Sequence, residues 1–207
     1  MKLADYEMQF AHRRIFTGVR ERSPQPQPLY RRLLGNAYDT LPPTLQQLHG
    51  LDRHLVAEGR AKVEHGKRIL ARLIAAAVGF PPAGADVPVT VDFRRDQSAE
   101  VWRRRFDGRE FSSTQAEGRG RFDRLLCEQF GPATVGLALV VETGRLRLLV
   151  RCWSLFGLAM PTALAPKCEA YEYEETGRFH FFVDIGLKWI GRLVRYQGWL
   201  ELWAPVP

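Results

Sequence analysis

The sequence has few of the residues that build covalent or metal-held sites. It contains three cysteines, Cys127, Cys152 and Cys168, and none of them lies in a CxxC spacing. An odd number of dispersed cysteines argues against a disulfide framework and a thiolate zinc site, and it favours a reducing compartment. The five histidines show no HExxH or other recurrent ligand spacing, so we expect no bound metal.

Motifs of the common enzyme classes are also absent. The chain has no GxSxG nucleophile elbow, no GxxxxGKS/T phosphate loop and no GxGxxG dinucleotide fingerprint. We therefore expect no cofactor, and several familiar hydrolase and nucleotide-binding classes are excluded. An enzyme that holds its substrate in a shaped pocket beside one acid or base would leave no such motif.

Long apolar runs are missing as well. The longest uncharged stretches, residues 73–85 and 152–166, are interrupted by glycine and proline and are too short to cross about 30 Å of hydrocarbon. The first ten residues carry acids where a signal peptide needs a basic region before an apolar core. We expect no transmembrane segment and a cytoplasmic location.

Arginine, by contrast, is abundant. The formal net charge is +7, and 25 arginines accompany only five lysines. The cations are interleaved with acids, as where Arg103, Arg104 and Arg105 are followed by Asp107 and Glu110. A nucleic-acid interface needs its cations gathered on one surface, so we interpret these charges as a solvated surface and expect no nucleic-acid partner.

The length of 207 residues allows one domain of ordinary size with a real core. Residues 1–22 mix apolar and charged residues in a loose helical pattern and read as an N-terminal helical appendage. The alternating prolines of residues 23–28 favour extended backbone, which is typical of a linker. We expect residues 29–207 to form a single domain.

Helical spacing of apolar residues occurs in three places. It predicts a helix over residues 29–41 that ends at Pro42 and Pro43, and a short helical turn over residues 44–48. A further helix is expected over residues 67–78. Its shared apolar face would be formed by Ile69, Leu70, Leu73, Ile74 and Ala77.

Most of the remaining chain alternates with a period of two, which is typical of strands. The alternating rows cover residues 55–63, 87–93, 122–130, 135–141, 146–152, 179–185 and 196–203. Hairpin turns are expected at residues 107–108, 117–118, 143–144 and 176–177, where a polar residue precedes glycine. We predict a mainly β (α+β) fold, a calycin-like antiparallel barrel or strongly curved sheet of about nine or ten strands. N-terminal helices and one helix after the first strand would accompany it, and a two-sheet β-sandwich is the alternative.

One strand pattern suggests a polar group inside the barrel. Trp102, Arg104 and Phe106 share one face, because successive side chains of a strand alternate. If this face points inward, Arg104 must meet a carboxylate of the protein, such as Glu128, or of a ligand. The alternative places Arg104 at the barrel mouth, reaching to water or stacked on Trp102.

Two further segments have less specific patterns. The uncharged residues 153–166 form either a core-covering turn or a lid over the barrel mouth. In residues 169–175, Tyr171 and Tyr173 share one face, and Glu172 and Glu174 share the other. We interpret this alternation as a core face opposite a wet face.

A series of short motifs resembles the bacterial domain-of-unknown-function family 4166. The motifs are LYRRLLG with LPP, GRAKV, the Trp102–Phe106 pattern, EQFGP, residues 157–161 and YQGWL, in this order over residues 29–203. Members of that family often follow a saccharopine-dehydrogenase-like reductase domain that binds NADP. The resemblance therefore implies a possible separate reductase partner, and it implies no catalytic residue.

The leading functional hypothesis is a barrel that encloses a small hydrophobic or amphipathic molecule, such as a lipid, with a polar or acidic head group. The expected ligand-binding residues are Trp102, Arg104, Phe106, Glu128, Trp153, Tyr171 and Tyr196. One alternative is a cofactor-independent cyclase, isomerase or hydrolase in which Glu128 or Tyr196 exchanges a proton. Another is an accessory domain that docks to a partner reductase through its N-terminal helix.

Overall fold

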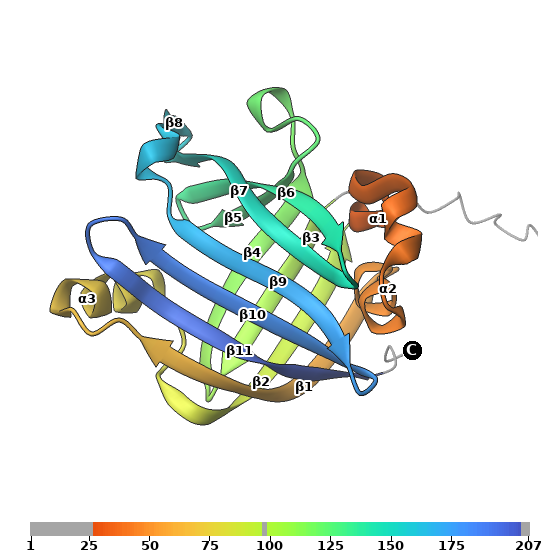
Figure 1. Ribbon diagram of the computed structural model, residues 1–207, viewed down its shortest axis with the longest axis horizontal. Helices are drawn as coiled ribbons and strands as arrows, with labels where there is room; N and C mark the ends of the chain where they lie inside the picture. The colour runs from red at the N-terminus through yellow and green to blue at the C-terminus, as the bar shows by residue number, and fades with distance from the viewer. Residues whose placement is uncertain (1–26, 97–98, 204–207) are drawn as a thin grey trace, which may run out of the picture.

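The computed structural model describes residues 27–96 and 99–203 as a mainly β fold (Figure 1). The predicted appendage and most of the predicted linker lie outside these residues. The strands are β1 (His54–His65), β2 (Gly84–Asp96), β3 (Ala99–Phe106), β4 (Arg109–Glu117), β5 (Leu126–Phe130), β6 (Ala133–Glu142), β7 (Arg145–Leu155), β8 (Leu158–Met160), β9 (Lys167–Glu175), β10 (Arg178–Leu187) and β11 (Gly191–Trp203). The helices are α1 (Leu29–Leu34), η1 (Gly35–Thr40), α2 (Pro43–His49), α3 (Ile69–Val78), η2 (Gly120–Phe122) and η3 (Thr162–Leu164).

Ten of the strands form a closed antiparallel barrel, and the short strand β8 is attached to β7 outside the ring. The strands follow the order β6-β5-β4-β3-β2-β1-β11-β10-β9-β7, and pairing of β6 with β7 closes the circle. The predicted barrel is therefore confirmed, and the sandwich alternative is wrong. Closure removes the open edges that a sheet of this size would otherwise expose.

Three of the four predicted hairpin turns are present. The pairs Asp107–Gly108, Thr143–Gly144 and Thr176–Gly177 all have positive φ, as two-residue hairpins require. The expected turn at residues 117–118 is wrong, because a loop over residues 118–125 connects β4 to β5. Strand β5 consequently starts only at Leu126, although the alternation suggested a strand from residue 122.

The helices lie at both ends of the barrel (Figure 1). Helices α1 and α2 cover the end where β1 begins, and they bury Leu29, Tyr30, Leu45 and Leu48 almost completely. The helix predicted over residues 29–41 continues beyond Leu34 as the tighter helix η1. Within the described residues, no helix has the length and apolar character needed to cross a bilayer.

Helix α3 follows β1 and lies at the opposite end of the barrel (Figure 1). Its buried residues are Ala71 and Ala75, whereas Ile69, Leu70 and Leu73 are exposed. The alanines allow close packing beside Gly66, where an added Cβ would lie 3.0 Å from the Cβ of Ala71. Ile69, Leu70 and Leu73 of the predicted face are thereby turned toward solvent, whereas Ile74 is partly buried against the core.

Strands β1 and β11 approach each other closely at two glycines. A Cβ added to Gly59 would overlap with the carbonyl oxygen of Trp199, and one added to Gly198 would overlap with that of Arg60. Glycines at such positions permit the strong local coiling that a closed barrel needs. The pairing of the first and last strands therefore depends on the absence of two side chains.

Replacing Gly198 with alanine is expected to lower the free energy of unfolding by about 2 kcal/mol or more, because the two backbones must separate. Urea denaturation followed by tryptophan fluorescence measures the loss. The control Glu58→Ala removes an exposed side chain from β1 and should change stability by less than about 0.5 kcal/mol. Equal stability of Gly198→Ala and the unaltered protein would contradict the expectation.

Candidate functional site

The interior of the barrel contains a cavity of about 70 Å³. Residues of β2, β3, β9, β10 and β11 form its wall. The wall is aromatic and aliphatic except for Arg104, Glu172 and the phenol of Tyr196. An apolar chamber with a few polar groups is the usual composition of a small-molecule site.

Arg104 lies on the inner face of β3, with 12% of its side chain exposed. Its Nη1 donates a hydrogen bond to Ser113 Oγ at 2.8 Å, and its Nη2 donates to Glu128 Oε1 at 3.1 Å. The guanidinium also lies over the rings of Trp102 and Phe111, 5.0 and 5.6 Å from their centroids. Both features of the sequence interpretation, a carboxylate partner and stacking on Trp102, are present together.

Glu128 is the centre of a buried hydrogen-bond network. Its Oε1 accepts hydrogen bonds from Arg104, from Ser113 Oγ at 2.7 Å and from Gln115 Nε2 at 3.1 Å. Gln115 in turn accepts a hydrogen bond from the hydroxyl of Tyr30 at 2.8 Å. The network therefore connects β3, β4 and β5 to helix α1, and it satisfies a carboxylate whose burial would otherwise be costly.

A second polar pair lies beside the cavity. Nε2 of His49, in the last turn of α2, is 2.6 Å from Glu172 Oε2 on β9. His49 is fully buried and stacks on Tyr30 with a centroid separation of 3.7 Å. Its Nδ1 has no hydrogen-bond partner among the residues described. This arrangement presents a histidine-backed carboxylate to the chamber, a pairing that can hold or transfer a proton.

Glu100 is a third buried carboxyl group, located on β3 near the helical end. It accepts a hydrogen bond from Trp102 Nε1 at 3.2 Å through Oε2, and its Oε1 has no partner in the described part of the chain. Burial raises the pKa of Glu100 above its ordinary value, and the nearby His49 only partly opposes this effect. Desolvation favours the neutral form because a charge is costly in an apolar surrounding.

Two other ionisable groups are held in their neutral forms. Burial raises the pKa of the Tyr196 phenol well above its ordinary value, so this residue is a poor proton donor to a reaction at neutral pH. Burial also raises the pKa of the Cys168 thiol to about 12. A thiol that remains protonated is a weak nucleophile, and all three cysteines are free.

The structure brings together five of the seven residues that the sequence suggested. Trp102, Arg104, Phe106 and Tyr196 line the cavity, and Glu128 lies directly behind Arg104. Their role in binding a ligand stays a prediction.

The other two suggested residues do not line the cavity. Tyr171 stacks on Phe182 at 4.8 Å, and the guanidinium of Arg145 lies over its ring. Trp153 donates a hydrogen bond to the carbonyl of Pro161 at 3.0 Å and thereby holds the segment that contains β8 and η3.

The interpretation of Glu172 as a solvated residue is wrong, since it is buried and lines the cavity. The turn at Thr176–Gly177 sets the register of β9 and β10 and places Glu172 opposite Phe181. Directly paired residues of antiparallel strands share a face. The alternating row that contains Phe181 therefore carried the signal that Glu172 points inward. Tyr30, His49, Glu100, Ser113 and Gln115 were also missed, because their contacts are set by the closure of the barrel.

The Arg104–Glu128 pair yields a prediction about stability. Replacing Arg104 alone with leucine leaves Glu128 buried without its cation and is expected to lower the free energy of unfolding by about 3–5 kcal/mol. The double variant Arg104→Leu/Glu128→Gln should regain more than half of this loss, because glutamine can still accept from Ser113 and Gln115. Urea denaturation of Arg104→Leu, of Glu128→Gln alone and of the double variant measures the coupling, and additive losses would contradict it.

Glu100 yields a prediction about pH. Because its pKa is raised in the folded state, its contribution to stability is fully present below the pKa of the unfolded chain and is lost as pH rises through the folded pKa. The variant Glu100→Gln should match the unaltered protein near pH 4 and should be more stable near pH 8. Thermal unfolding across this range tests the sign, and a constant difference between the two proteins would refute it.

Within residues 27–96 and 99–203, no group of three or more histidine, cysteine or acidic side chains is arranged to hold a metal ion.

Comparison with known proteins identifies a family. No curated protein and no solved structure matches the chain. The family described as "Domain of unknown function (DUF4166)" matches residues 41–200, including all the residues that line the cavity. Since this match spans well over half of the sequence, the protein belongs to that family.

Proposed function

We propose that the protein binds a small molecule with an apolar body and a polar end inside its barrel. The observation that carries this proposal is the apolar chamber whose wall contains a nearly buried guanidinium. Interiors of small barrels are usually filled by side chains. A void beside an arginine is a feature that a purely structural core does not need.

The size of the chamber limits the ligand. Pockets that enclose drug-sized molecules measure roughly 300–1,000 Å³, whereas this cavity measures about 70 Å³. A few water molecules, or a compound of a few heavy atoms, would fill it. The ligand is therefore a compact molecule, or one narrow end of a larger molecule inserted between the aromatic rings.

The charges around the chamber favour an uncharged polar end. Arg104 is already paired with Glu128, and Glu172 is paired with His49. A ligand anion would therefore add a charge without meeting a free cation. Arg104 uses two of its N–H groups on Ser113 and Glu128, and an arginine has five. A hydroxyl, amide or protonated acid could accept from the others and donate to Glu172.

A second candidate function is catalysis without a cofactor, and the His49–Glu172 pair favours it. Glu172 lines the chamber while His49 lies behind it, so a proton removed from a bound molecule could be held at this pair. Glu172 replaces Glu128 and Tyr196 as the candidate proton acceptor. Glu128 is committed to three hydrogen bonds, and Tyr196 is held neutral.

Filling the chamber should abolish binding. Val183 of β10 lines the cavity, so Val183→Phe is expected to place its ring there and to reduce retention of a co-purified small molecule at least tenfold. Native mass spectrometry of protein produced in its own host measures retention. The control Val140→Phe adds the same ring to an exposed position of β6. Equal retention by both variants would refute the proposal, and chemical conversion of the retained molecule would favour the catalytic candidate.

A further inference from the structure

Large exposed apolar side chains gather at one end of the barrel. Apart from Val140 and Trp203, every one of them in the described residues lies on α3, on the turn between β10 and β11, or on the segment between β7 and β9. All three elements lie at the end opposite to α1 and α2 (Figure 1). An apolar surface concentrated on one end of a molecule marks an interaction site.

The centre of this region is formed by α3 and the neighbouring turn. Ile69, Leu73 and Trp189 are 78%, 62% and 72% exposed, and Leu70 lies beside them on the helix. Nη1 of Arg68 donates a hydrogen bond to the carbonyl of Trp189 at 2.7 Å, which holds the helix start against the turn. We call Ile69, Leu70, Leu73 and Trp189 the α3 surface.

Cations surround the α3 surface. Lys67, Arg68, Arg72 and Lys188 are exposed, and none of them forms an ion pair with a residue that the structure describes. Arg68 and Arg72 donate only to backbone carbonyls, and the ammonium of Lys188 lies 4.7 Å from the ring centroid of Trp189. Their positive charge is therefore not compensated within this part of the chain.

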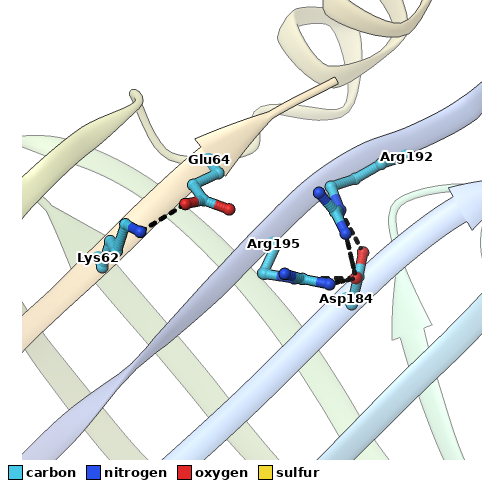
Figure 2. Close-up of polar contacts among 5 residues, drawn as sticks. All are labelled: Lys62, Glu64, Asp184, Arg192 and Arg195. Carbon is cyan, nitrogen blue, oxygen red and sulfur yellow. Dashed lines mark hydrogen bonds and ion pairs between the residues drawn. The ribbon is translucent and has the colours of Figure 1, made fainter. Parts of the chain in front are cut away.

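The acids near the ends of β1 and β10, Glu64 and Asp184, do not neutralise these cations, because they are paired with others. Figure 2 shows Glu64 joined to Lys62, with a separation of 2.6 Å, and Asp184 held between Arg192 and Arg195. The single carboxylate of Asp184 is paired with two guanidinium groups, at N···O distances of 2.9 Å for Arg192 and 2.6 Å for Arg195. The region around α3 consequently keeps an excess of positive charge.

We propose that the α3 surface docks the barrel onto a membrane surface that contains anionic phospholipids. A short helix with exposed leucine and isoleucine, a neighbouring tryptophan and flanking basic residues is suited to lie in the headgroup layer without crossing the bilayer. The uncompensated cations supply the attraction to anionic headgroups. This proposal is independent of what the barrel cavity binds.

Vesicle sedimentation with the full chain tests the proposal. At low ionic strength the protein should pellet with vesicles of phosphatidylcholine and phosphatidylglycerol, and far less with phosphatidylcholine alone. The double variant Leu73→Ser/Trp189→Ser should bind at least about tenfold more weakly, because two apolar side chains no longer enter the interface. The matched control Val140→Ser/Trp203→Ser removes exposed apolar residues elsewhere and should bind like the unaltered protein.

The charge requirement is tested separately. Lys67→Glu/Lys188→Glu should reduce binding to the anionic vesicles by roughly twentyfold or more, at about fivefold for each cation lost. Arg103→Glu/Arg124→Glu makes the same change in net charge on other parts of the surface and should have a much smaller effect. High salt should weaken binding.

Three outcomes would overturn the proposal. The first is failure of the full chain to bind anionic vesicles. The second is equal binding by each variant and its matched control. The third is a dimer in sedimentation velocity that Leu73→Ser/Trp189→Ser converts to a monomer, because a second copy of the chain would then be the occupant.

Discussion

The ion pair between Arg104 and Glu128 is the constraint around which the interior is arranged. A guanidinium inside a closed barrel needs a carboxylate, and the carboxylate needs further donors for its remaining lone pairs. Ser113 and Gln115 supply them, and Gln115 is held in turn by Tyr30 of α1. The helical end of the barrel is therefore tied to the middle of the sheet by directed hydrogen bonds as well as by apolar packing. Such connected polar groups specify one arrangement of their elements more strictly than apolar contacts alone.

Most of the fold could be predicted from the sequence because its signals are local. Alternation marked the strands, and polar-glycine pairs marked three of the hairpins. The failures arose where local pattern and tertiary packing disagree. The alternation of residues 122–125 continues that of β5, yet Gly120 and Arg124 both have positive φ and form a loop. In α3 most of the large apolar residues of one face are exposed, and the fully buried contact is made by Ala71 and Ala75, of which Ala71 lies close to Gly66.

The candidate site was predictable only in part, for the same reason. Strand parity placed Trp102, Arg104 and Phe106 on one face, and the structure puts all three at the cavity. The His49–Glu172 pair joins residues 123 positions apart, and Tyr30 and Gln115 are 85 positions apart. No local period encodes such contacts, because they exist only after the strands have closed around the helices. Counting residues outward from a tight turn gives the residue opposite each strand position, and in this way the inward orientation of one member of such a pair, Glu172, can be predicted.

The pairing of β11 with β1 has a consequence for the biogenesis of the protein. Strand β11 fills the place between β1 and β10, and its Gly198 lies opposite Ala61, which comes much earlier in the sequence. While a ribosome is still making residues 191–203, both neighbouring strands have open edges that could pair with another chain. Ring closure is thus deferred until β11 has been synthesised, and during that interval the two open edges favour association with other chains.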